Sequence, residues 1–223
     1  LLTIVADDGR VLVDEARVVG LGQGVGDRGQ LAPDRMAAAE LVLSEYVQAC
    51  EAHDIAAWRV RAVATSAARR AMNTEPWLSR VRRKLGLRIE VISGDEEARL
   101  TWAGATSDVT DANSTILVVD LGGGSTELVY GTREKMMWRT SLELGSVRLT
   151  EQFLGRGQAD PSKLVALRKH VDIGLDAVAF EPAACAIGVA GTVTTLAAMA
   201  LGIDIWDAER VHGSCLSKEA LIG

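Results

Sequence analysis

The sequence predicts an α/β fold, because strand-like and helix-like stretches alternate along its 223 residues. Residues 116–119 form an uncharged β-branched run, which is typical of a buried strand. Residues 33–53 repeat apolar side chains at helical spacing. Residues 58–73 and 184–202 each pass from a strand-like run through a short turn into a helical pattern. These observations favour sheets that are flanked by helices.

A glycine-rich hairpin at residues 116–130 is the strongest local pattern. The buried strand ends at Asp120, and residues 122–124 are three consecutive glycines. Residues 125–130 alternate between two faces, which indicates a strand that runs back. Because glycine adopts positive φ without a steric cost, we expect the turn to use that freedom. Such a turn can direct successive N–H groups at an anion. The sequence thus predicts phosphate binding by Gly122, Gly123, Gly124 and Ser125.

Other glycine motifs fit this stretch less well. A dinucleotide-binding fingerprint opens a helix after its last glycine, whereas a strand follows here. A Walker A loop needs a lysine before its Ser or Thr, and this turn contains no lysine. A plain glycine-rich hairpin is the alternative to a phosphate-binding turn.

The charge of the chain is unevenly distributed. Its formal net charge of −6 argues against general nucleic-acid binding. Residues 59–88 nevertheless carry nine basic side chains against Glu75 alone, which is a local net charge of +8. A basic block in an acidic protein suits a polyanionic substrate, although solvated faces are the alternative. The basic side chains are those of Arg59, Arg61, Arg69, Arg70, Arg80, Arg82, Arg83, Lys84 and Arg88.

The three cysteines, Cys50, Cys185 and Cys215, are scattered and odd in number. No spacing among them indicates a structural zinc site or a disulfide framework, so we expect the protein to be located in a reducing cytoplasm. Residues 183–203 are uncharged and long enough to span a bilayer. Glycines and threonines divide that stretch into strand, turn and helix, and we therefore expect no membrane segment.

The first half of the chain is expected to begin with a hairpin and continue with helices and short strands. Thr65 and Ser66 lie at a strand-to-helix turn, where hydroxyls cap a helix and where anions also bind. Arg69 follows one turn later, so Ser66 and Arg69 are predicted to contact phosphate, with capping alone as the alternative for Ser66. Expected strands cover residues 1–6, 11–19, 58–64 and 88–92, and expected helices cover 33–53, 65–73 and 74–86.

Acidic side chains open the next helix, at residues 95–97. Acids in a first helical turn interact favourably with the helix dipole, which alone would explain them. Glu96 and Glu97 differ in direction by about 100°, so one can face solvent while the other faces a cleft.

The second half adds further candidate residues. Gly145, Ser146 and Arg148 open a helix and could hold a phosphate, although a helix cap explains the first two equally well. His170 is expected on the surface of a long helix. Expected strands cover residues 135–142, 184–189 and part of 206–216, and expected helices cover 144–155, 161–179 and 190–202, with another beginning at 217.

Several stretches resemble motifs of the exopolyphosphatase and guanosine pentaphosphate phosphohydrolase family. Residues 120–127 (Asp-Leu-Gly-Gly-Gly-Ser-Thr-Glu) are similar to its second phosphate motif, and residues 93–98 are similar to its Ser-Gly-x-Glu-Glu-Ala motif. Arg17 with residues 21–25, and residues 65–73, are similar to other motifs of the family. The resemblance extends over nearly all of the chain.

The resemblance implies two ribonuclease-H-like domains of the actin, hexokinase and Hsp70 fold group, with mixed sheets flanked by helices. It places the active site in the cleft between the domains and makes Glu97 the catalytic carboxylate. Gly191 and Thr192 resemble a later glycine loop of the fold group, which faces the phosphate chain. A polar loop at residues 107–114 marks the expected boundary, with domain I at 1–112 and domain II at 113–223.

The sequence departs from the family pattern at both ends. The family's first phosphate motif, an Asp-x-Gly-Ser/Thr-Asn-Ser-type turn, is absent and would be expected just before Leu1. The closing strands and helices of the family are also missing. We therefore expect the chain to be a piece of a longer protein, with both domains incomplete.

The expected function is hydrolysis of a phosphoanhydride, at the end of inorganic polyphosphate or of guanosine pentaphosphate. Asp120 would ligate Mg²⁺, Glu127 would help to position metal or water, and Glu97 would deprotonate the attacking water. The rivals are an ATP-dependent kinase of the same fold group and a non-enzymatic sensor of polyphosphate or alarmone. We expect a homodimer, as is common in the family, without nucleic-acid or membrane partners.

Overall fold

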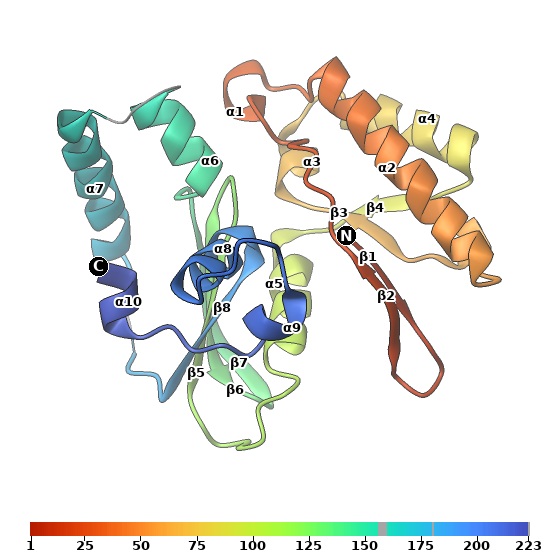
Figure 1. Ribbon diagram of the computed structural model, residues 1–223. Helices are drawn as coiled ribbons and strands as arrows, with labels where there is room; N and C mark the ends of the chain where they lie inside the picture. The colour runs from red at the N-terminus through yellow and green to blue at the C-terminus, as the bar shows by residue number, and fades with distance from the viewer. Residues whose placement is uncertain (156–159, 180, 223) are drawn as a thin grey trace. The chain divides into compact units, whose positions relative to one another are not determined.

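The computed structural model describes residues 1–155, 160–179 and 181–222, and its elements fall into two units, Leu1–Gly94 and Asp95–Gly223 (Figure 1). Each unit combines strands with helices. In the second unit, β5 pairs antiparallel with β6 and parallel with β8, so its sheet is mixed. The predicted α/β class with mixed sheets flanked by helices is confirmed.

The first unit contains two two-stranded sheets, an antiparallel pair β1–β2 and a parallel pair β3–β4. Its elements in chain order are β1 (Leu2–Val5), β2 (Val11–Glu15), α1 (Val25–Arg28), α2 (Pro33–Ala52), the 3₁₀ turn η1 (Ala57–Arg59), β3 (Ala62–Ala64), α3 (Ser66–Arg70), α4 (Thr74–Leu85) and β4 (Ile89–Val91).

Local sequence signals explain the two long helices of this unit. α2 has Pro33 at its first position, where the missing N–H of proline costs no hydrogen bond. α4 ends at Gly86, whose φ of 70° closes the helix in the left-handed conformation. The strand expected at 58–64 is shorter than predicted, because residues 57–59 form η1 and the ladder with β4 begins only at Ala62. The helix expected at 65–73 likewise ends at Arg70.

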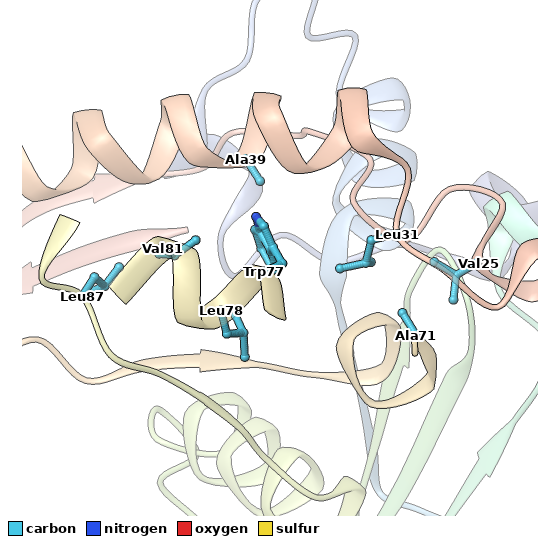
Figure 2. Close-up of a cluster of buried hydrophobic side chains, with 8 residues drawn as sticks. All are labelled: Val25, Leu31, Ala39, Ala71, Trp77, Leu78, Val81 and Leu87. Atoms are coloured by element: carbon cyan, nitrogen blue, oxygen red, sulfur yellow. The ribbon is translucent and has the colours of Figure 1, made fainter. Parts of the chain in front are cut away.

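The core of the first unit lies between α2 and α4. Trp77 and Val81 point from α4 toward α2, where Ala39 points back (Figure 2). Leu31 and Val81 are almost completely buried. Burial of a large apolar side chain contributes about 1.5–3 kcal/mol each, so this cluster is the main support of the unit.

The second unit is built on a four-stranded sheet with the order β7-β6-β5-β8. Ala98 and Trp102 of α5 pack against Ile116, Val118 and Val129 on one face of this sheet. The elements are α5 (Gly94–Ala105), β5 (Ile116–Leu121), β6 (Thr126–Thr132), β7 (Lys135–Leu142), α6 (Ser146–Leu149), the π-helical turn η2 (Thr150–Leu154), α7 (Pro161–Asp176), β8 (Cys185–Val189), α8 (Ala190–Ala200), α9 (Ala208–Val211) and α10 (Lys218–Ile222).

Two expectations for the second unit are wrong. Within the described residues no strand forms across 206–216, because Asp207 accepts a hydrogen bond from Arg210 N–H and thereby starts α9 instead. His170 is half-buried rather than on the surface, and the centroid of its ring lies 5.1 Å from that of Phe153.

The units divide between Gly94 and Asp95, so that α5 is grouped with the sheet on which it packs. The domain limits of 1–112 and 113–223 stay a prediction. Among the described residues, no helix combines the length and the hydropathy needed to cross a bilayer. The uncharged stretch 183–203 contributes β8 and α8.

Candidate active site

A row of polar side chains crosses the sheet of the second unit. Asp120 of β5 lies opposite Glu127 of β6, and Glu127 lies opposite Ser141 of β7. Because strand side chains alternate, this row shares a face with Val118 and Val129, which pack on α5. The carboxylates therefore project from the face of the sheet that α5 covers.

Asp120 is surrounded by other carboxylates. Its burial, and then the negative charges of Glu127 and Glu97, raise the pKa of the Asp120 carboxyl above its usual value. The hydroxyl of Thr101 donates to Asp120 Oδ2 at 3.4 Å, and this hydrogen bond lowers the pKa of Asp120 but does not offset the other causes. The ionised form of Asp120 is thus disfavoured here, and a bound cation would relieve the repulsion.

Glu127 is held by two serine side chains. Ser125 Oγ and Ser141 Oγ each donate to Glu127 Oε1 at 2.8 Å. Ser125 is buried, and its hydroxyl is directed at Glu127. In this arrangement Ser125 orients a carboxylate.

Glu96 and Glu97 interact with different partners, although they are adjacent on α5. The guanidinium of Arg99 donates to both carboxylate oxygens of Glu96, each at 2.8 Å. Glu97 instead acts on Asp120, whose pKa its charge raises. Of the two acids, Glu97 is therefore the one associated with the polar row.

The glycine turn at residues 122–124 is closed by a hydrogen bond of 3.0 Å from Gly122 N–H to the Ser125 carbonyl. Its carbonyl groups are occupied by α6. Gly122 O accepts from Ser146 N–H at 3.0 Å, and Gly123 O accepts from Arg148 N–H at 2.9 Å. Within the described ranges, the N–H groups of Gly123 and Gly124 have no hydrogen-bond acceptor. These two donors are suited to an anion.

The expectation that the turn glycines use positive φ is wrong, because none of residues 122–124 lies in the left-handed region. Close packing explains the lack of side chains instead. A Cβ on Gly145 would collide with the backbone of Gly123 and Gly124, and a Cβ on Gly123 would lie 3.1 Å from Val147 Cγ2. The start of α6 therefore lies directly against the turn.

Arg148 contacts the glycine turn through a backbone carbonyl. Its Nε donates to Gly124 O at 2.8 Å, and its Nη2 lies 2.5 Å from Glu143 Oε2. The guanidinium thus already has two oxygen partners. Ser146 Oγ in turn accepts from Thr192 Oγ1 at 3.0 Å, which ties α6 to the start of α8.

The start of α8 has an unusual backbone. Ala190 has a φ of 70°, which an alanine adopts only at a steric cost. Gly191 follows it and is exposed, and its carbonyl accepts from Thr195 Oγ1 at 2.7 Å. Val189, the last residue of β8, lies opposite Asp120 in the parallel pairing. The first turn of α8, which carries Gly191 and Thr192, therefore follows the sheet directly next to Asp120.

Two predicted phosphate contacts belong to the first unit. Ser66 is the first residue of α3, and Arg69 lies in the last turn of the same helix. The Arg69 guanidinium donates to Ile92 O at 2.9 Å, which fixes the side chain near the end of β4. Their contact with phosphate stays a prediction.

A family model described as the Ppx/GppA phosphatase family matches residues 3–218. The chain belongs to the Ppx/GppA phosphatase family. Its resemblance to exopolyphosphatases and guanosine pentaphosphate phosphohydrolases is therefore confirmed, and its fold is that of the family.

Relatives of known name support this assignment. Exopolyphosphatase 2 of Mycobacterium tuberculosis is 39% identical over 210 residues, which are 89% of this chain and 64% of the relative. Guanosine-5'-triphosphate,3'-diphosphate pyrophosphatase of Photobacterium profundum is 35% identical over 151 residues, which are 67% of this chain and 29% of the relative. The chain thus spans less than two thirds of the length of these curated relatives.

Solved structures of the family agree with the fold. The crystal structure of an exopolyphosphatase-like protein has a TM-score of 0.85 and 36% identity, and the match covers 98% of this chain and 70% of that one. The Aquifex aeolicus member of the Ppx/GppA family has a TM-score of 0.77 and 33% identity, with coverage of 98% and 71%.

The residues of the polar row suit a magnesium ion. Among the described residues, no group of three or more His, Cys, Asp or Glu side chains could hold a metal by itself. Mg²⁺ does not need such a group, because it is commonly bound by one or two carboxylates together with waters and substrate phosphates. Asp120 and Glu127, which are paired on the adjacent strands β5 and β6, provide two such carboxylates.

Sequence analysis did not identify Thr101 and Ser141. Thr101 lies four residues after Glu97, so both side chains lie on one face of α5, and this spacing is a signal that could have been used. Ser141 gave no comparable signal, because its position opposite Glu127 depends on the pairing of β6 with β7.

Proposed function

We propose that this chain belongs to a phosphatase that releases terminal phosphate from a phosphoanhydride chain. The observation that carries the proposal is the pair of facing carboxylates, Asp120 and Glu127, beside a glycine turn with two N–H groups that have no acceptor among the described residues. The names of the relatives, an exopolyphosphatase and a guanosine pentaphosphate pyrophosphatase, support the same chemistry.

Each group has a separate task in the proposed reaction. The N–H groups of Gly123 and Gly124 bind oxygens of the phosphate that is released. Asp120 and Glu127 hold Mg²⁺, which when bound neutralises charge on the phosphates. Glu97 accepts the proton of the attacking water. Positioning and charge neutralisation supply most of the rate enhancement.

The surrounding residues are assigned according to their contacts. Ser125 orients Glu127, and Gly145, Ser146 and Arg148 keep the carbonyls of the turn directed away from the phosphate. Gly191 and Thr192 contact the phosphate chain from the start of α8. Ser66 and Arg69 of the first unit are assigned to phosphate binding as well, and the remaining basic side chains of residues 59–88 attract the polyanion.

The test is phosphate release by the full-length protein, measured separately with inorganic polyphosphate and with guanosine pentaphosphate, in the presence and absence of Mg²⁺. Magnesium-dependent release from either substrate supports the proposal, and the ratio of the two rates identifies the main substrate. Tight binding without release would favour the sensor, and phosphate transfer from ATP would favour the kinase.

We also propose a cytoplasmic homodimer. Cys50, Cys185 and Cys215 are all free thiols, which agrees with a reducing compartment. Analytical ultracentrifugation of the full-length protein tests the oligomeric state, and a monomer at micromolar concentration would contradict it.

A further inference from the structure

Two hydroxyl groups converge on one oxygen of Glu127. Ser125 Oγ and Ser141 Oγ both lie 2.8 Å from Oε1. Ser125 comes from the same hairpin as Glu127, whereas Ser141 comes from the neighbouring strand β7. Oε1 is therefore held from two directions.

This arrangement leaves the other oxygen of Glu127 available. A carboxylate oxygen has about two lone-pair sites, and both sites of Oε1 are filled by the serines. Among the described residues, Oε2 accepts no hydrogen bond. Glu127 thus has one oxygen anchored by the serines and one available oxygen. Asp120 lies opposite Glu127 on the neighbouring strand β5.

The strand that supplies Ser141 is itself fixed to α5. Arg139, two residues earlier and on the same face of β7, forms an ion pair with Asp95 in the first turn of that helix. The same turn carries Glu97. β7 therefore contacts Glu127 through Ser141 and the helical turn that carries Glu97 through Arg139.

We propose that Ser141 is a positioning residue, which acts with Ser125 to fix Glu127 so that Oε2 becomes a ligand of the divalent cation shared with Asp120. This inference rests on the proposed function. Without Ser141, Oε1 keeps only one of its two donors, and the carboxylate can rotate away from the cation. Partners that orient metal-ligating carboxylates typically contribute 10–100-fold to metal affinity or activity.

The experiment compares three variants of the full-length protein. Ser141→Ala removes the hydroxyl, Ser141→Thr restores one, and Thr140→Ala is the matched control from the opposite face of β7. Binding of Mn²⁺ without substrate is measured by the EPR signal of the free ion, and the Mg²⁺ dependence of turnover is measured in parallel. Unfolding temperatures without cation check that each variant is folded.

We expect Ser141→Ala to weaken Mn²⁺ binding about 10–100-fold, with Ser141→Thr and Thr140→Ala within a few-fold of the unaltered protein. Unchanged Mn²⁺ binding by Ser141→Ala, in a protein whose unaltered form releases phosphate, would overturn the role of Ser141 and leave the proposed function intact. Equal losses in Ser141→Ala and Ser141→Thr would also overturn it, because the hydroxyl would then not be the cause. If the unaltered protein shows no saturable Mn²⁺ binding and releases no phosphate, the proposed function itself is refuted.

Discussion

Glu40 of the first unit and Asp120 of the second are both withdrawn from water, and their surroundings shift their pKa values in opposite directions. Burial alone would raise the pKa of Glu40, but Arg80, the Trp77 indole N–H and Lys84 outweigh it and leave the pKa lowered. Arg80 Nη2 and Trp77 Nε1 lie 2.5 and 3.1 Å from Glu40 Oε1. Asp120 has carboxylates as neighbours, and its pKa is raised.

The difference separates a carboxylate that supports the fold from one that is suited to chemistry. The fold supplies Glu40 with donors and opposite charges, so its ionised form stabilises the first unit. It leaves Asp120 next to Glu127, an arrangement that lowers stability unless a cation or proton is bound. Perturbed pKa values of this second kind cluster at functional sites.

The largest expected effect is on catalysis, at Glu97. Glu97→Gln keeps the size of the side chain but cannot accept a proton. We expect turnover of the full-length protein to fall about 10²–10⁴-fold with little change in substrate affinity, as measured by phosphate release. Stability should change by at most about 1 kcal/mol, because the helix dipole contributes no more than that here.

Glu96→Gln is the matched control for Glu97. Glu96 is paired with Arg99, so its loss should have a mild effect on turnover. A stronger effect at Glu96 than at Glu97, or full turnover by Glu97→Gln, would show that the base is assigned to the wrong residue.

The next largest effect is on stability, at Glu40. Glu40→Gln removes the charge that Arg80 and Lys84 contact and weakens the acceptor of Trp77. We expect the free energy of unfolding to fall by about 1–3 kcal/mol, measured by urea denaturation. Glu45→Gln on the exposed side of α2 should leave it within about 0.5 kcal/mol. Equal effects of the two changes would mean that the buried contacts contribute nothing.

The two carboxylates also predict opposite responses to pH. Glu40 titrates near 4.5 when unfolded and lower when folded, so its contribution is complete above about pH 4.5 and is lost as the pH falls through the folded pKa. The raised pKa of Asp120 makes its ionisation destabilising as the pH rises from 3.8 through the folded value. In urea denaturation across this pH range, the free energies of unfolding of Glu40→Gln and of the unaltered protein should therefore become equal as the pH falls.

The smallest expected effect is a gain in stability at Asp120. Asp120→Asn removes like-charge repulsion across the β5–β6 pair, so we expect the free energy of unfolding without cation to rise by about 0.2–1 kcal/mol at neutral pH. Mg²⁺ should raise the unfolding temperature of the unaltered protein and leave that of Asp120→Asn unchanged. A loss of stability in the variant would mean that Asp120 resembles Glu40 rather than contrasting with it.

Local patterns in the sequence were sufficient for most elements and for the main site residues. The helix from Pro33, the stop at Gly86 and the hairpin around residues 122–124 follow from capping, backbone freedom and alternation, which act between near neighbours. The close match of residues 93–98 and 120–127 to family motifs identified Glu97 and Asp120 as candidates.

Only the tertiary structure could place Ser141 beside Glu127. Thr132 pairs with Lys135, and a regular ladder from that point would bring Thr140 opposite Glu127. A register shift between Tyr130 and Gly131 brings Ser141 there instead. Because side chains alternate along a strand, a shift of one residue exchanges which hydroxyl faces the site, and no local pattern in the sequence specifies it. The contacts of Glu40 with Trp77 and Arg80 likewise arise only when α2 and α4 pack.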